Sequence, residues 1–215
     1  MMNLDRFRRL PLLGILRGIA AVDVPPLVEA VIAAGLETLE ITMNTADAPA
    51  LIRSMTAAAG GRLTIGAGTV LGMRDLDAAL DAGAGFIVMP TLVAQVAESC
   101  RAAAIPVFPG ALTPQEIFNA WQAGATMVKV FPASCFGPAY LREIKGPFAD
   151  IELLACGGVS ADNIATYFAA GASAAAFGGS VFRADWLAEQ RYERIGQEVA
   201  KLVQACRAAR GQASI

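Results

Sequence analysis

Lysine is scarce in this chain, and one of its three lysines, Lys129, lies within the apolar segment MVKVFPA at residues 127–133. If this segment is a β-strand, alternation places Lys129 on one face with Met127 and Phe131, and two valines on the other. An amine in a poorly hydrated site is pushed toward its neutral form, which can attack a carbonyl and form a Schiff base. The alternative is a lysine at a strand end whose ammonium reaches water.

A carboxylate could supply the proton transfers that Schiff-base chemistry requires. Glu40 lies in the segment TLEIT, where alternation places it on the same face as Thr38 and Thr42. The chain contains no histidine, so acid–base work falls to a carboxylate, a lysine, a tyrosine or water. We therefore expect Glu40 to relay protons near Lys129. The alternative is an ion pair, either with an arginine or with Lys129 itself, whose ammonium it would stabilise.

Two glycine-rich segments follow apolar runs in the second half of the chain. Backbone N–H groups left bare by glycine, together with the start of a following helix, can bind a phosphate. The residues expected at this phosphate site are Gly157, Gly158, Gly178, Gly179 and Ser180. Arg17 follows the first apolar run and could hold two oxygens of a carboxylate or phosphate at once. A single glycine pair is usually only a turn, but two pairs at such positions favour a phosphate site.

Nucleotide and metal sites are not expected. The segment GAGT at residues 66–69 lacks both the lysine of a P-loop and the dinucleotide fingerprint. Without histidine, only scattered carboxylates and cysteines remain as metal ligands, and they show no metal-site spacing.

A repeated pattern organises the elements that must position these residues. Four Ala-rich helical patterns end in a glycine that precedes a short apolar run, at Gly35, Gly83, Gly124 and Gly171. A glycine just past a helix, where it can take a positive φ, is typical of a helix-to-strand junction. Eight strands are expected, near residues 12–16, 37–42, 63–67, 86–89, 105–108, 126–131, 151–155 and 174–177.

Strands that alternate with helices predict a (β/α)8 TIM barrel, an α/β fold that forms a single domain over residues 1–215. The runner-up is a doubly wound open sheet. A short lead-in precedes the first strand, and a long helix over roughly residues 186–209 ends in a polar tail. Barrel enzymes work at the carboxyl ends of their strands, which is where the candidate lysine, glutamate, arginine and glycine pairs fall.

The composition limits the partners and the compartment. Hydrophobic residues make up 55% of the chain and charged residues 17%, which suits a sheet buried on both faces. The formal net charge of −2 gives no basic surface for nucleic acid or an anionic membrane. The four cysteines form no C-x-x-C pair, which is typical of reduced thiols in the cytoplasm. The uncharged stretch at residues 163–182 contains glycines and serines and predicts helix, turn and strand rather than a membrane span.

The motifs, taken in order, resemble those of a known family. They are LEIT at residues 39–42, GAGTV at 66–70, FIVMP at 86–90, PGALTPQE at 109–116, VKVFPAS at 128–134 and CGGV at 156–159. This ordered set resembles the 2-keto-3-deoxy-6-phosphogluconate and 6-phosphogalactonate aldolases, from about Leu12 to Arg183. The resemblance implies a class I aldolase on a (β/α)8 barrel, usually a homotrimer, that needs no metal or organic cofactor.

The resemblance also implies roles for individual residues. Lys129 would be the Schiff-base lysine and Glu40 the proton shuttle. The residues implied at the pyruvyl pocket are Thr69, Pro90 and Phe131, and those implied at the phosphate are Gly158, Gly179 and Ser180. The implied small-molecule partners are pyruvate and a phosphorylated keto-sugar acid.

Two substrates that differ at the C4 hydroxyl compete within this family. The chain has EITMNT, with Asn44, where the phosphogluconate type looks like EITLRT, and it has ILRGI with Arg17. It also has Cys156 where the phosphogluconate type commonly has threonine. These features resemble the phosphogalactonate branch, whereas FGGS at residues 177–180 looks closer to the phosphogluconate enzymes, and Cys156 matches the usual residue of neither branch.

We therefore expect reversible cleavage of 2-dehydro-3-deoxy-6-phospho-D-galactonate to pyruvate and D-glyceraldehyde 3-phosphate. The phosphogluconate epimer, or activity on both epimers, is the alternative within the family. The alternative of another class is a non-catalytic barrel that binds a phosphosugar or keto acid, with Lys129 serving only as a charge.

Overall fold

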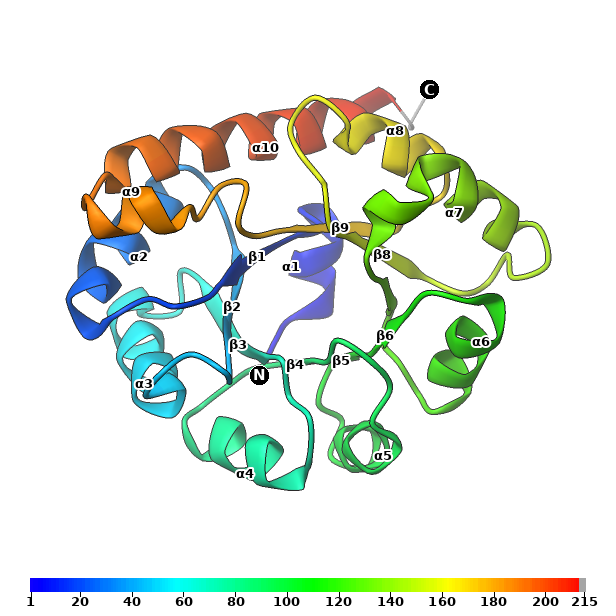
Figure 1. Ribbon diagram of the computed structural model, residues 1–215, viewed down its shortest axis with the longest axis horizontal. Helices are drawn as coiled ribbons and strands as arrows, with labels where there is room; N and C mark the ends of the chain where they lie inside the picture. The colour runs from blue at the N-terminus through cyan, green and yellow to red at the C-terminus, as the bar shows by residue number, and fades with distance from the viewer. Residues whose placement is uncertain (213–215) are drawn as a thin grey trace.

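The computed structural model describes residues 1–212 and shows a closed ring of parallel strands surrounded by helices (Figure 1). The strands are β1 (Leu12–Leu16), β2 (Thr38–Thr42), β3 (Thr64–Gly68), β4 (Ile87–Val88), β5 (Val107–Phe108), β6 (Gly110–Ala111), β7 (Val128–Val130), β8 (Leu153–Cys156) and β9 (Ala174–Phe177). Their order in the sheet is β5-β4-β3-β2-β1-β9-β8-β7-β6. The prediction of a TIM barrel is confirmed, and the open-sheet alternative is wrong.

Helix α1 (Leu4–Arg9) precedes the first strand and lies across the middle of the ring in Figure 1, and the other helices surround the barrel. These are α2 (Val24–Ala33), α3 (Ala48–Ala59), α4 (Met73–Asp81), α5 (Ala94–Ala102), α6 (Pro114–Gln122), α7 (Gly137–Lys145), α8 (Ile164–Ala169), α9 (Ala184–Ala188) and α10 (Tyr192–Gln212), with 3-10 turns η1 (Ala21–Asp23) and η2 (Ala133–Cys135). Within residues 1–212, no helix is long and apolar enough to span a membrane.

The fifth barrel strand differs from the prediction, because Pro109 divides it into β5 and β6. Proline has no N–H to donate to the sheet, but its carbonyl still accepts a hydrogen bond from the Lys129 N–H at 2.9 Å. On either side, Val107 accepts from the Thr126 N–H at 2.8 Å and Ala111 accepts from the Phe131 N–H at 3.0 Å. The two short strands therefore act as one barrel strand and close the ring against β7.

The helix-to-strand junctions match the sequence pattern. Gly35, Gly83, Gly124 and Gly171 have φ angles of +82°, +89°, +95° and +96°. These angles lie in the left-handed region, which glycine adopts at little steric cost because it has no side chain. The four repeats of the pattern are confirmed as four junctions of this kind.

The C-terminal helix is shorter at its start than predicted. A separate helix, α9, ends at Ala188, and Gln190 takes a left-handed φ of +54° before α10 begins at Tyr192. A non-glycine residue in that region cannot continue a right-handed helix, so the expected helix from residue 186 is broken into two. The last residues of the predicted polar tail, 213–215, lie outside the described residues.

The barrel has two apolar layers. One lies between the strands and the surrounding helices, and the other lies inside the ring of strands. The inner layer near the amino ends of the strands contains Phe7, Phe86, Phe108 and Met127. Phe7 comes from α1, and its ring meets Phe108 edge-on with centroids 5.8 Å apart. The lead-in helix thus fills this end of the barrel, which leaves the carboxyl ends of the strands as the open end.

Candidate active site

Lys129 and Glu40 both lie inside the barrel, as alternation along their strands predicts. Lys129 is the middle residue of β7 and is 6% exposed, and Glu40 is the middle residue of β2 and is 1% exposed. Val128 and Val130 instead join the apolar layer between strands and helices. The other two lysines of the chain are half-buried or exposed. Lys129 is therefore the lysine that the fold withdraws from water.

Lys129 lies near an aromatic ring and a thiol. Its Nζ atom is 5.2 Å from the centroid of the Phe131 ring, a distance at which an ammonium is attracted to the ring face. Burial raises the pKa of the Cys156 thiol to about 11, and the nearby Lys129 charge acts in the opposite direction. At this pKa the thiol is neutral at physiological pH. Cys156 therefore adds a small, polarizable and uncharged wall beside the amine.

Glu40 is a buried carboxyl group that titrates near neutral pH. Burial raises its pKa to about 7, while the positive charges of Lys129 and Arg17 act to lower it. Its Oε2 atom is buried and has no hydrogen-bond partner in the described part of the chain. A carboxyl group with a pKa near the working pH can both accept and donate a proton, so this residue suits general acid–base work.

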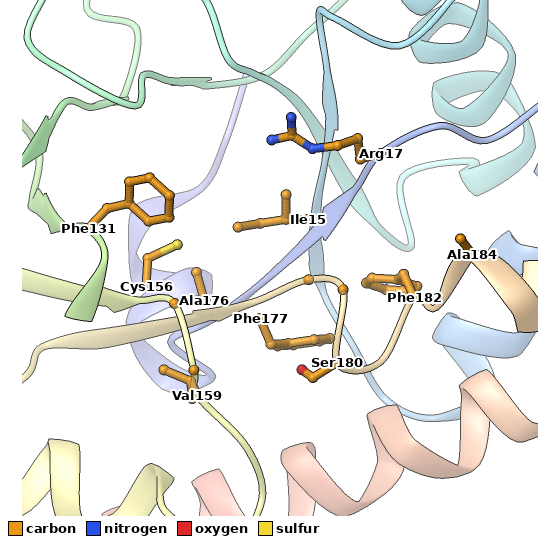
Figure 2. Close-up of a pocket in the computed structure, with 14 residues that line it drawn as sticks. Ile15, Arg17, Phe131, Cys156, Val159, Ala176, Phe177, Ser180, Phe182 and Ala184 are labelled. Carbon is orange, nitrogen blue, oxygen red and sulfur yellow. The ribbon is translucent and has the colours of Figure 1, made fainter. Parts of the chain in front are cut away.

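A cavity of about 510 Å³ opens at the carboxyl ends of β1, β7, β8 and β9 (Figure 2). This volume is within the range of sites for small molecules. The predicted site residues that line it are Arg17, Phe131, Cys156, Gly157, Gly158, Gly178, Gly179 and Ser180. In Figure 2 the Arg17 guanidinium is directed toward the side of the cavity that Phe131 and Cys156 border. The structure thus brings the glycine pairs and the arginine around one space.

Both glycine pairs lie at the rim of this cavity, but only one takes an unusual backbone conformation. Gly157 and Gly158 have φ angles of +98° and +75°, which favour glycine. The three residues from Gly178 to Ser180 have no positive φ and follow directly after β9. The rim therefore presents backbone from two neighbouring strands, which suits an anion with several oxygens.

Five other predicted residues do not line this cavity. These are Glu40, Lys129, Asn44, Thr69 and Pro90. Glu40 and Lys129 lie in the middle of β2 and β7, and Asn44, Thr69 and Pro90 lie in the loops after β2, β3 and β4. Glu40 and Lys129 are connected to the cavity through their neighbours, because the Arg17 charge acts on Glu40 and the Lys129 charge acts on Cys156. Asn44 is exposed, and Thr69 and Pro90 are half-buried.

Sequence reasoning missed a threonine that positions the Arg17 loop. Thr45 is 6% exposed, and its Oγ1 atom accepts a hydrogen bond from the Gly18 N–H at 3.0 Å. The same atom is 3.0 Å from the Thr42 hydroxyl oxygen. These contacts join the loops after β1 and β2. The motif EITMNT contains Thr45, but its hydrogen bond to a residue 27 positions away has no signal in one sequence.

The cavity also has an apolar wall that was not predicted. Ile15, Val159, Phe177 and Phe182 contribute to it. They are ordinary apolar residues of strands and loops, and nothing in their type distinguishes them from the core. For metal binding, residues 1–212 contain no cluster of three or more Cys, Asp or Glu side chains suited to an ion.

Thr69 has a strained backbone at the end of β3. Its φ angle is +56°, which is a genuine outlier for a β-branched residue and costs of order 1–3 kcal/mol. Asparagine tolerates this region better. We expect Thr69→Asn to raise the free energy of unfolding by about 1 kcal/mol and to lower turnover, because strain of this kind persists where it serves a site. Chemical denaturation and a turnover assay check both effects, and a loss of stability would contradict the strain argument.

Comparisons with known proteins agree with this geometry. A family model described as KDPG and KHG aldolase matches residues 4–198. The chain is 38% identical over 202 residues to the 2-dehydro-3-deoxy-6-phosphogalactonate aldolase of Escherichia coli strain K12, covering 94% of this chain and 97% of that protein. It is 37% identical over 180 residues to the 2-dehydro-3-deoxy-phosphogluconate aldolase of Pseudomonas aeruginosa, covering 80% and 81%. A solved structure described as native KDPGal has a TM-score of 0.88 and 37% identity, covering 94% of this chain and 97% of that chain.

Proposed function

The chain belongs to the KDPG and KHG aldolase family, and from this premise we propose the reaction that it catalyses. The protein is a class I aldolase, a lyase that cleaves 2-dehydro-3-deoxy-6-phospho-D-galactonate reversibly to pyruvate and D-glyceraldehyde 3-phosphate. The observation that carries the proposal is that one lysine, Lys129, and one glutamate, Glu40, are both buried inside the barrel, close enough for the Lys129 charge to act on the Glu40 carboxyl group.

Lys129 is the nucleophile in this proposal. Its neutral amine attacks the C2 carbonyl, and loss of water from the resulting carbinolamine gives an iminium ion. The electrons of the C3–C4 bond then move into the iminium as that bond breaks. This leaves an enamine of pyruvate on Lys129, which is protonated at C3 and hydrolysed to release pyruvate and the free amine.

Glu40 moves the protons of this sequence. As a carboxylate it removes the proton of the C4 hydroxyl, through a water, while the C3–C4 bond breaks and the aldehyde forms. The protonated carboxyl group then returns a proton when the enamine is protonated at C3. A pKa of about 7 suits both directions of transfer.

The remaining residues hold the two ends of the substrate. The proposed phosphate site is formed by Gly157, Gly158, Gly178, Gly179 and Ser180, which line the cavity. Arg17 binds a carboxylate or phosphate, and Thr69, Pro90 and Phe131 surround the pyruvyl group. No metal or organic cofactor takes part in this chemistry, since the lysine itself forms the electron sink.

The choice between C4 epimers rests on Asn44 and Cys156 and on the relatives of this chain. Asn44 and Cys156 take the places of an arginine and a threonine of the phosphogluconate type, and the relative from Escherichia coli that matches 94% of this chain acts on the galactonate compound. The relative at 37% identity acts on the gluconate compound. We propose that the enzyme acts in galactonate degradation, with activity on both epimers as the second candidate.

We further propose that the enzyme is a cytoplasmic homotrimer. The four cysteines are free thiols, which suits a reducing compartment. Phe118 and Phe136 are 41% and 60% exposed, and large aromatic side chains on a surface favour protein contacts. Light scattering after size exclusion would give three times the 22.3 kDa chain mass for a trimer and a single chain mass for a monomer.

Borohydride trapping tests the proposed reaction. The protein is incubated with pyruvate, reduced with borohydride, digested and analysed by mass spectrometry. A reduced adduct on Lys129 alone is the expected result, and kcat/KM for the two epimers then gives the preference. A folded protein that forms no adduct at saturating pyruvate would contradict the aldolase mechanism.

A further inference from the structure

Two glycines of β3 face the barrel interior, where a side chain has no room. An ideal Cβ at Gly68 would overlap the Glu40 Oε1 atom and would lie 2.5 Å from the Glu40 carboxyl carbon. An ideal Cβ at Gly66 would lie 2.5 Å from the Cε1 and Cε2 atoms of Phe86. Real Cβ atoms essentially never approach other atoms this closely. Neither glycine has a positive φ, so a larger residue is excluded by space and not by backbone conformation.

The space beside Gly68 is occupied by the Glu40 carboxyl group. β2 and β3 are parallel neighbours, and their register pairs Glu40 with Gly66 and Thr42 with Gly68. The Glu40 side chain therefore leans along the strand from its own partner toward the next inward-facing position of β3. There it is 1% exposed, and one of its oxygens has no hydrogen-bond partner in the described part of the chain. Contact with Gly68, and not a hydrogen bond at that oxygen, limits where the carboxyl group lies.

We propose that Gly68 is a positioning residue, whose missing side chain leaves the slot that holds the Glu40 carboxyl group inside the barrel. The catalytic consequence rests on the proposed function, in which Glu40 moves protons beside Lys129. A methyl group at residue 68 displaces the carboxyl group from the slot. Because Phe7, Phe86 and Phe108 fill the amino end of the barrel, the space left for the carboxyl group lies toward the open end. The motif GAGT thus serves a carboxyl group of the protein itself and not a nucleotide phosphate.

Displacement from the slot has two consequences that ordinary damage to a strand does not produce. The carboxyl group moves away from the point where it can meet the water and the C4 hydroxyl, so turnover falls more than substrate binding. It also gains hydration, and because burial is the main cause of its raised pKa, that pKa falls toward its ordinary value. The acid limb of the pH–rate profile therefore moves to lower pH.

The test is the variant Gly68→Ala, with Gly72→Ala as its matched control. Gly72 lies in the loop after the same strand, has an extended φ of −178°, and has no atom within 4 Å of an added Cβ. We expect Gly68→Ala to lower kcat roughly 100-fold, within the range of general acid–base effects, with little change in KM. Gly72→Ala should stay close to the wild type. A ¹³C NMR titration of the Glu40 carboxyl group should show a lower pKa in Gly68→Ala.

Shortening the glutamate provides the second arm. Aspartate lacks one methylene, so its carboxyl group does not reach the slot, and Gly68→Ala should cost little further activity in a Glu40→Asp background. If Gly68→Ala alone does not fold, the coupling between residues 40 and 68 is measured through the free energy of unfolding. The double variant should then have the same free energy of unfolding as Glu40→Asp. Equal penalties in both backgrounds, or an unchanged Glu40 titration in a folded Gly68→Ala, would overturn the proposal. Absence of turnover in the wild type would instead contradict the proposed function. The NMR titration would still show whether Gly68 positions the Glu40 carboxyl group.

Discussion

Lys129→Arg is expected to abolish turnover, with kcat lower by roughly 10⁴- to 10⁶-fold, as when a covalent nucleophile is removed. Arginine retains the positive charge and much of the length of lysine, but its guanidinium stays protonated and does not form the imine. Binding of pyruvate should change far less than turnover, because the charge that attracts a carboxylate remains. Steady-state kinetics, pyruvate titration and borohydride trapping measure the three quantities separately.

The matched control for this experiment is Lys201→Arg. Lys201 is an exposed lysine of α10 that pairs with Glu198, far from the strand ends in the sequence. The control should retain wild-type turnover and the trapped adduct on Lys129. If Lys129→Arg kept turnover within tenfold of the wild type, the Schiff-base mechanism would be wrong. A wild type that binds pyruvate without any turnover would instead support the non-catalytic barrel.

The fold could be predicted from the sequence because its signals are local. Each of the four glycines at helix ends acts within its own turn, and period-two alternation separates Lys129 from Val128 and Val130, and Glu40 from Leu39 and Ile41, within a single strand. The division of the fifth strand at Pro109 follows a local rule as well, since proline cannot donate to a sheet. That division was missed because the apolar run before Pro109 looks like a complete short strand.

The site could be predicted only in part, because its details depend on register between strands. The slot at Gly68 exists because Glu40 pairs with Gly66 across β2 and β3. The Thr45 contact with Gly18 likewise joins two loops that the barrel brings together. One sequence shows which residues of a strand share a face, but it does not show which of them meet across strands. The missed features are therefore contacts between strands and loops.

Glu40→Gln is the second substitution with a large expected effect. Glutamine has nearly the same size, so it fits the slot at Gly68, but it does not accept and return a proton at neutral pH. We expect kcat/KM to fall by roughly 10²- to 10⁴-fold, the usual range for loss of a general base. In the wild type, the carboxylate form increases as pH rises through about 7, so kcat/KM should rise over this range. This rise in kcat/KM should be missing in Glu40→Gln. If the variant still shows a rise near pH 7, the titrating group is not Glu40.

Stability provides an independent measure of the same carboxyl group. Its pKa is about 7 in the folded protein against an ordinary value of 4.5, so between these pH values the folded state binds a proton that the unfolded state has released. The contribution of this proton to the free energy of unfolding is fully present below about pH 4.5. It is lost as pH rises through about 7, because the folded protein must then bury a charged carboxylate. We expect the wild type to lose free energy of unfolding relative to Glu40→Gln between pH 5 and pH 8, measured by chemical denaturation. Glu98→Gln, on the exposed part of α5, is the surface control and should follow the wild type. Parallel curves for the wild type and Glu40→Gln would mean that the carboxyl group is already ionised at pH 5, and the acid limb of the rate profile could not then belong to Glu40.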